Sequence, residues 1–425
     1  IAFFFIPISG LVNSGSSDQY ILGGVIPWSD AFTNHLNALR FLYGGVMNQS
    51  TALRPISAVF YDLILVLTGQ DFFALYLIVT FFVGLSTVLL VRKIETSFSG
   101  IAAIFVYLNA YFYIRLFVGT FMTEPVGFIF GNFAFLFFMK GVLERRQDAF
   151  IAASFLLSLS LNARPGPMIV LAAVGLWYFF VFLKGEKRRF LYAALAFVAM
   201  LLPFAFNELT ARIVTNNAPL VNRQFAEFAY GLCLGGKSGY DTMFMNEMTA
   251  LDNSANPTGE LIRLCGETLR SHPENLWVSV REIFRVLIFD RERGAFSYFH
   301  GDNDLLIAVF RFVLMGLWSV GAFLIFRNRR KPFYGFLLYA GFGFFLSQFI
   351  IPPFAAFRMR YHASVIVLPA FFAAIPVERF YVRYFKKKKH SSPSGETTGT
   401  LSAVKVNREN DRSAAVITVL CTLFT

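Results

Sequence analysis

Long apolar runs recur along the whole length of this sequence and constrain its fold more than any other feature. Of the 425 residues, 56% are hydrophobic and only 15% are charged, too little charge for the surface of a soluble protein of this size. In lipid, backbone polar groups must be satisfied within the chain, so apolar runs of this length predict membrane-crossing α-helices. The sequence therefore predicts an all-α polytopic membrane protein.

About ten apolar segments suit transmembrane helices by length and composition. A first helix ends within residues 1–12, and the short segment 55–68 fits a half-helix or re-entrant piece better than a complete span. Together the segments define a transmembrane domain of residues 1–385. The other candidate spans are residues 70–90, 100–118, 125–142, 149–162, 166–183, 190–206, 304–326, 333–351 and 361–381.

Both ends of the sequence are typical of a fragment. It starts with Ile1 inside an apolar run, and residues 414–425 begin another run that is too short to span a membrane. Residues 386–413 are rich in Ser, Thr, Gly and Lys, a composition typical of a disordered basic tail. Its lysines favour anionic lipid head groups, as is general for juxtamembrane segments.

Five basic clusters end or join the spans and set the predicted orientation, because cytoplasmic loops are enriched in Lys and Arg. All five are cytoplasmic if residues 55–90 make one net crossing of the plasma membrane. Loops 13–54 and 207–303 are then extracytoplasmic, and the net charge of +12 requires no nucleic-acid partner. The clusters are Arg92-Lys93, Arg145-Arg146, Lys187-Arg188-Arg189, residues 327–331 and residues 386–389.

Loop 207–303 is long enough for a small extramembrane subdomain. Its residues 259–290 contain two helical patterns, and the second has Arg281 and Arg285 opposite an apolar face. That pattern fits a juxtamembrane helix lying on the membrane surface or over the bundle. Cys233 and Cys265 in the same loop either form a disulfide, if the loop is extracytoplasmic, or remain two buried thiols.

The first predicted outer loop contains a short amphipathic helix. Ser29 fits its N-cap and Gly44-Gly45 fits its stop signal. Asp30 then lies in the first turn, on a polar stripe with Asn34 and Asn37. The helix dipole favours the ionised form of a carboxylate at this position. Asp30 either complements the dipole only or is a candidate for chemistry at the membrane surface.

Arginine is more frequent in the predicted outer loops than the orientation rule allows, and it stands in apolar company. A guanidinium near hydrocarbon is costly unless it is paired or faces a wet cavity, and it matches phosphate geometry. Each arginine either snorkels to the interface, or several converge on an anionic ligand such as a lipid phosphate. The loop residues are Arg40, Arg54, Arg164, Arg358 and Arg360, and Arg115 lies within a span near its outer end. Tyr361 and His362 directly follow Arg360.

Glu124 precedes Pro125 at the outer start of a predicted span. It is either a helix cap, a partner for an outer arginine, or a second acid near Asp30. No pair of histidines has metal-ligand spacing, so no cofactor is indicated and a divalent metal stays open.

Residues 231–238 match the pattern of a phosphate-binding P-loop. The pattern is meaningful only between a strand and a helix of a parallel α/β sheet. No alternation of strands and helices surrounds it, and the predicted orientation places it outside the cell. We interpret the match as coincidental.

Several of these motifs together resemble the GT-C class of integral-membrane glycosyltransferases, which use polyprenyl-phosphate sugars. The resemblance covers residues 1–385. Tyr230-Gly231-Leu232 with Gly235-Gly236 is similar to a glycine-rich segment in a poorly characterised bacterial subgroup. The other motifs are Trp28-Ser29-Asp30, Arg54-Pro55, Thr123-Glu124-Pro125, Asn162-Ala163-Arg164-Pro165 and Arg360-Tyr361-His362.

The resemblance implies an enzyme that moves a sugar, with inversion, from a polyprenyl-phosphate donor to a glycan, lipid or protein acceptor at the outer membrane face. It implies Asp30 as the base that activates the acceptor, with Glu124 as a second catalytic candidate. Many members have paired acids where this sequence has Ser29 before Asp30, so the base and any metal requirement stay open. The residues that would bind the donor and its phosphate are Arg54, Arg115, Arg164, Arg358, Arg360, Tyr361 and His362.

The alternative function is a flippase or exporter of lipid-linked sugars. Such a carrier needs phosphate-binding arginines but no base. Transporters commonly contain internal repeats and polar sites near the bilayer midplane. This sequence has no clear repeat, and its polar residues gather at the predicted outer face, which favours the enzyme.

Overall fold

The computed structural model describes residues 1–12, 20–45, 55–214, 221–236, 257–290, 294–298, 304–349 and 358–383. These residues are mostly helical, with one two-stranded antiparallel hairpin of β1 (Ile21–Leu22) and β2 (Ile26–Pro27) among them. Arg54, the side chain of Arg358 and the predicted segments 386–413 and 414–425 lie outside the described part.

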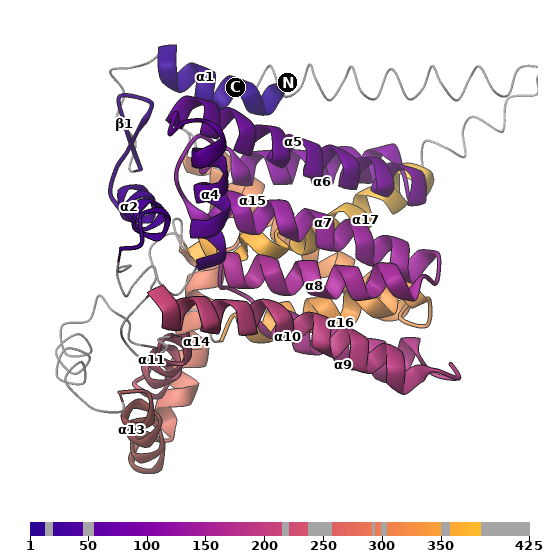
Figure 1. Ribbon diagram of the computed structural model, residues 1–425. Helices are drawn as coiled ribbons and strands as arrows, with labels where there is room; N and C mark the ends of the chain where they lie inside the picture. Colours follow the sequence, from indigo (N-terminus) through magenta and orange to yellow (C-terminus); the bar gives the residue numbers. More distant parts are fainter. Residues whose placement is uncertain are drawn as a thin grey trace, which may run out of the picture.

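Apolar helices packed side by side form the body of the protein (Figure 1). η1 (Ala2–Phe4) and α1 (Phe5–Val12) lie beside the first long helix. The body consists of α5 (Phe72–Ser97), α6 (Gly100–Ile114), α7 (Thr123–Leu143), α8 (Gln147–Ala163), α9 (Ile169–Trp177) with the π-helical turn η2 (Tyr178–Phe182), α10 (Arg189–Val214), α15 (Asp304–Arg327), α16 (Pro332–Ser347) and α17 (Val367–Tyr381).

Four helices in the described part are long and apolar enough to cross a membrane: α5, α7, α10 and α15. The 3-10 helix η3 (Arg358–Val365) and α17, bent by 77°, supply a fifth if they count as one span. Other apolar helices are shorter, and α6, with 15 residues, extends only about 22 Å at 1.5 Å per residue. The prediction of about ten spans is therefore not confirmed.

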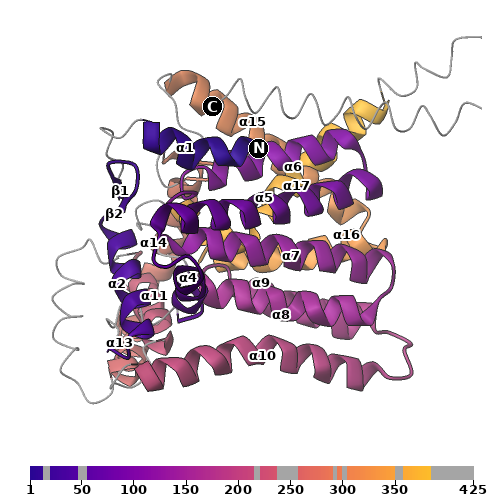
Figure 2. The same cartoon turned by 45° about the horizontal axis from the view of Figure 1, so that its top comes forward.

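α4 (Pro55–Leu67) lies across one end of the bundle instead of along it, in both views (Figures 1 and 2). Its Tyr61 hydroxyl donates to the Met122 carbonyl at the start of α7, and its Ser57 hydroxyl donates to the Ala163 carbonyl at the end of α8, over 2.8 Å. The 55–68 segment therefore packs on the ends of α7 and α8 and does not run along the bundle.

Three further helices, α11 (Val221–Cys233), α13 (Pro257–Ser271) and α14 (Glu274–Phe289), lie at the same end as α4, with α2 (Asp30–Leu42) (Figure 2). We call this the α2–α4 end. α13 and α14 match the two helical patterns predicted in residues 259–290, and Arg281 and Arg285 are exposed. α10 continues to Val214, past the residue 207 at which the loop was expected to begin, because the apolar pattern fades before the helix ends.

The basic clusters gather at the opposite end of the bundle, which we call the basic end (Figure 2). The Lys93 ammonium of α5 pairs with the Glu144 carboxylate that follows α7, at 2.6 Å. The rings of Phe98 and Phe333 lie 5.3 Å apart and join the α5–α6 turn to the start of α16. Four of the five predicted cytoplasmic clusters fall among the described residues, and these share one end.

η3 approaches its neighbours closely because two glycines leave room for its backbone. A Cβ atom on Gly131 of α7 would collide with the Ser364 carbonyl, and one on Gly166 would collide with the Tyr361 carbonyl. The Ser364 hydroxyl also donates to the Ser160 carbonyl of α8, over 3.0 Å. η3 is thus held against α7 and α8, which decides where its side chains point.

The described part of the P-loop match, Gly231 to Gly236, ends a helix. The Gly236 N–H donates to the Gly231 carbonyl over 2.9 Å, and Gly235 has a φ of 83°, as in a glycine C-cap. A phosphate-binding loop instead follows a strand and precedes a helix. The local geometry agrees with a coincidental match, and Lys237 lies outside the described residues.

Candidate active site

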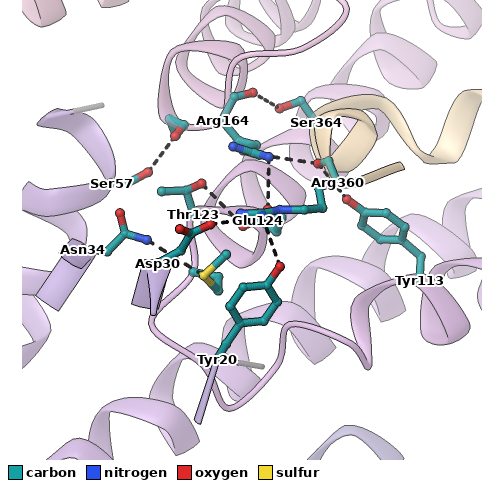
Figure 3. A network of polar contacts seen from close by, with 12 residues as sticks. Tyr20, Asp30, Asn34, Ser57, Tyr113, Thr123, Glu124, Arg164, Arg360 and Ser364 are labelled. Carbon is teal, nitrogen blue, oxygen red and sulfur yellow. Dashed lines mark hydrogen bonds and ion pairs between the residues drawn. The ribbon is translucent and has the colours of Figure 1, made fainter. Parts of the chain in front are cut away.

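A fully buried carboxylate, Glu124, holds two arginines at the α2–α4 end (Figure 3). Its Oε1 atom accepts a hydrogen bond from Arg360 Nε over 2.6 Å and pairs with Arg164 Nη2 at 3.2 Å. These two arginines hold the Glu124 carboxylate at the start of α7, where the N-cap residue Met122 makes no side-chain capping bond. Removing a carboxylate from water is costly, and the two guanidinium groups offset that cost.

Arg360 connects the buried Glu124 to the surface. Its Nη1 atom donates to Asp30 Oδ2 over 3.1 Å and to the Tyr20 hydroxyl over 3.0 Å. The Arg360 side chain is 14% exposed, whereas the Asp30 side chain is 58% exposed. A continuous chain of charges therefore runs from the interior to an acid that solvent or a substrate can reach.

Arg164 is almost completely buried and supports this chain from behind. Its guanidinium lies over the Tyr361 ring, 4.7 Å from the centroid, and its Nε donates to the Arg360 carbonyl over 3.5 Å. The Tyr113 hydroxyl donates to the same carbonyl over 3.1 Å. These contacts fix the backbone of η3 at Arg360 and so aim the Arg360 side chain at Glu124 and Asp30.

α2 carries Asp30 in its first turn, with Ser29 at the predicted N-cap position. Ser29 has a φ of 53°, and its side chain makes no capping hydrogen bond. The residue before it, Trp28, is tied to the hairpin, because its N–H donates to the Tyr20 carbonyl over 3.0 Å. Gly44, with a φ of 73°, ends the helix as predicted.

The polar stripe of α2 faces the bundle. Asn34 Nδ2 donates to the Phe121 carbonyl over 3.1 Å, and the Asn37 side chain is buried. Phe32, from the apolar stripe, is exposed instead. The carbonyls just before α7 need donors, and α2 supplies one, so Asp30 is placed beside the start of α7.

Tyr20 is a site residue that the sequence did not indicate. It lies next to the β1–β2 hairpin, which brings its hydroxyl to Arg360. Burial raises the pKa of Tyr20 to about 12, although the Arg360 charge acts in the opposite direction. The phenol is therefore neutral at physiological pH and accepts the guanidinium hydrogen bond. No motif or spacing in the sequence could have marked it.

Of the other predicted site residues in the described structure, Arg115 and His362 do not join the Glu124 cluster. Arg115 follows α6, and its guanidinium lies over the Phe112 ring at 4.9 Å. His362 points to the other side of η3, where its Nε2 meets the Gln348 side-chain amide at 3.1 Å. Tyr361 contacts the cluster through its ring, beneath Arg164.

An apolar cavity of about 280 Å³ lies on the His362 side of η3. It is bounded by α14, α15, α16, η3 and α17, and its only charged or titratable lining residue among the described ones is His362. η3 therefore separates a charged cluster from an apolar cavity. Large lining residues include Phe284, Met315, Trp318, Phe344 and Met359.

Within the described ranges, no group of three or more His, Cys, Asp or Glu side chains is arranged to hold a metal ion. Glu124 and Asp30 are both engaged by Arg360. The described residues therefore offer no candidate set of ligands for a divalent metal, which the sequence left open.

Comparison with known proteins finds a coarse structural likeness. No protein-family model and no curated protein matches the sequence. Two solved structures of the Archaeoglobus fulgidus oligosaccharyltransferase are similar: the apo form, with a TM-score of 0.49, and a form tethered to an acceptor peptide, with a TM-score of 0.43. Each is 12% identical over 99% of this chain, which spans about half of theirs (55% and 54%). Similarity at this level assigns no activity.

Proposed function

We propose that this protein is an integral-membrane glycosyltransferase of the GT-C type, which transfers a sugar from a polyprenyl-phosphate donor to an acceptor at the extracytoplasmic face. One observation carries the proposal: the exposed Asp30 carboxylate lies 3.1 Å from the Arg360 guanidinium, which Glu124 holds in place. Acceptor activation needs a base, and phosphate binding needs a cation. Asp30 and Arg360 supply these two groups at one point of the surface.

In the proposed mechanism the donor phosphate binds Arg360 and takes the place of Asp30. Asp30 then loses its cationic partner and accepts the proton of the acceptor hydroxyl. The hydroxyl oxygen attacks the anomeric carbon opposite the phosphate, the bond from that carbon to the phosphate oxygen breaks, and the configuration inverts. Arg360 stabilises the charge on the departing lipid phosphate.

Glu124 and Arg164 receive positioning roles, in place of the catalytic and phosphate-binding roles that the sequence suggested. Both side chains are almost inaccessible to solvent, and each is already paired. They act through Arg360, whose side chain and carbonyl they contact. The roles of Arg54 and Arg358 as phosphate ligands remain predictions.

The apolar cavity beside η3 supports a lipid donor. Its volume of about 280 Å³ suits part of a hydrocarbon chain, and its walls include the apolar helices α15, α16 and α17. A chain bound there would lie one helix diameter or less from Arg360, since His362 and Arg360 are on the same short helix.

The orientation follows from charge. The basic end belongs in the cytoplasm of a plasma membrane, and the α2–α4 end with Asp30 belongs outside. A lipid-linked donor suits that side, because no soluble nucleotide sugar is required there. The acceptor is a glycan, a lipid or a protein.

The test compares Asp30→Asn with wild type in reconstituted membranes, measuring sugar transfer from a polyprenyl-phosphate donor. Loss of the base should lower transfer by roughly 10²- to 10⁴-fold while the folded protein is retained. Asp148→Asn, an exposed acid at the basic end, is the matched control and should keep wild-type transfer. Equal transfer by Asp30→Asn would exclude Asp30 as the base.

The same experiment separates the enzyme from the carrier. A flippase needs no base, so lipid movement without any transfer by the wild type, unchanged in Asp30→Asn, would favour the carrier. Transfer that disappears while donor binding persists would favour the enzyme.

A further inference from the structure

Cys233 and Cys265 meet at the contact between α11 and α13. Cys233 is the last residue of α11 and is buried, and Cys265 follows the buried Leu261 of α13 by one helical turn. Both are free thiols in the structure, and their side chains lie close enough to each other to interact. Residues far apart in the loop are therefore already neighbours in the fold.

The helices that carry these thiols share a small core. Ala226 and Tyr230 of α11 and Leu261 of α13 are buried in it, and Cys265 packs against it. Such a core contributes little stability alone, and small extramembrane units commonly rely on covalent cross-links.

The surroundings argue against a reactive or metal-binding role for either thiol. Burial raises the pKa of the Cys233 thiol, and it raises the pKa of Cys265 to about 12. Both are thus protonated at neutral pH, unlike a nucleophilic or metal-bound thiolate. Among the described residues no cluster of potential metal ligands includes them.

Cross-linking α11 to α13 would also restrain α14. Asn275 Nδ2 of α14 donates to the Cys233 carbonyl over 3.0 Å, and the Ser279 hydroxyl donates to the Leu232 carbonyl over 2.6 Å. α14 in turn forms part of the wall of the apolar cavity. A restraint at the thiol pair therefore extends to three helices of the α2–α4 end.

We propose that Cys233 and Cys265 form a disulfide that links α11 to α13. The α2–α4 end lies opposite the basic clusters, so the charge rule places the pair on the oxidising side of the membrane. The reaction is thiol–disulfide exchange with a disulfide oxidant: one S–S bond forms between the two cysteines, and the oxidant's S–S bond becomes two thiols that take up the two protons. Exchange precedes the packing of α13, while the thiols can still ionise.

The test counts free thiols in the full chain, prepared without reductant from cells with an oxidising extracytoplasmic compartment, quenched in acid and then labelled with a maleimide under denaturing conditions. The chain has three cysteines, so Cys421 serves as the internal reference. The expected result is one maleimide per chain before reduction and three after it. A cross-linked pair of tryptic peptides, residues 224–237 with 264–270, should disappear on reduction.

Two variants make the result decisive. Cys233→Ser should show two maleimides before reduction, whereas the matched control Cys421→Ser should show none before and two after. Three maleimides in the wild type before reduction, or a disulfide that includes Cys421, would overturn the proposal. Labelling does not depend on sugar transfer, so Asp30→Asn should give the wild-type count whatever the outcome for the glycosyltransferase.

Discussion

The two sides of the candidate site are held very differently. On the η3 side, Glu124 and Arg164 are buried, and the Arg360 carbonyl is contacted by both Arg164 and Tyr113. On the α2 side, within the described residues, the largely exposed Asp30 carboxylate reaches the cluster through Arg360 alone. The difference indicates a fixed cation and an exchangeable acid, as the proposed mechanism requires when the donor phosphate takes the place of Asp30.

Glu124→Gln tests the fixed side and should have the largest effect on stability. The substitution removes the counter-charge of the buried Arg164 guanidinium and leaves Arg360 with the exposed Asp30 alone. Breaking a buried pair in this way typically costs about 3–5 kcal/mol. We expect a large fall in the free energy of unfolding in detergent, measured by thermal or denaturant unfolding.

Glu144→Gln is the control for this prediction. Glu144 also pairs with a cation, but it is 42% exposed at the basic end, where a surface ion pair contributes about 1 kcal/mol or less. If Glu124→Gln and Glu144→Gln lowered the free energy of unfolding equally, the Glu124 cluster would not be the firmly held half of the site.

The sequence could indicate this half of the site as a set of residues but not as a geometry. A charge beside an apolar run needs a partner, so outer arginines and Glu124 were expected to meet, and Glu124, Arg164 and Arg360 do lie together. Spacing does not reveal that Arg164 would be buried. Their roles in catalysis remain a proposal.

The α2 side was harder to predict because it depends on the hairpin before it. The contact of Tyr20 with Arg360 joins residues 340 positions apart. Ser29 also has a positive φ at the N-cap of α2, where its side chain makes no capping hydrogen bond. Amphipathic periodicity located α2 but did not show that its polar stripe would face inward, since the demand for donors comes from carbonyls before α7.

Asp62→Asn tests the support beneath α2 and should have the second largest effect. Asp62 lies on α4, is buried, and neither of its oxygens has a hydrogen-bond partner among the described residues. Burial raises its pKa from 3.8 to about 7. The folded state then binds a proton that the unfolded chain releases near pH 4, so the free energy of unfolding falls as pH rises from about 4 to about 7 and levels off above.

The size of this pH effect is about 2–4 kcal/mol. Asparagine cannot ionise, so Asp62→Asn should be more stable than wild type above pH 7 and should lose the decline between pH 4 and 7. Unfolding at a series of pH values measures both. Asp71→Asn, at the N-cap of α5, provides the control, because its exposed carboxylate already accepts two backbone hydrogen bonds. If the free energy of unfolding of Asp62→Asn still fell between pH 4 and 7, the pH dependence would belong to another group.

Tyr20→Phe tests the exchangeable side and should have the smallest effect. The substitution removes a neutral acceptor from Arg360, which keeps its bonds to Glu124 and Asp30. A hydrogen bond of this kind contributes about 1–2 kcal/mol, so sugar transfer should fall by about 5- to 30-fold. Transfer rates in reconstituted membranes measure the change.

The pH profile distinguishes a positioning role for Tyr20 from proton transfer. Since its pKa is about 12, Tyr20 stays protonated throughout the usual assay range, and Tyr20→Phe should lower transfer equally at every pH from 6 to about 9. Tyr43→Phe is the matched control, because Tyr43 lies at the same end and its hydroxyl contacts Gln70 instead of the cluster. A loss of 10²-fold or more, or a shifted profile, would move Tyr20 into the reaction itself and would contradict Asp30 as the sole base.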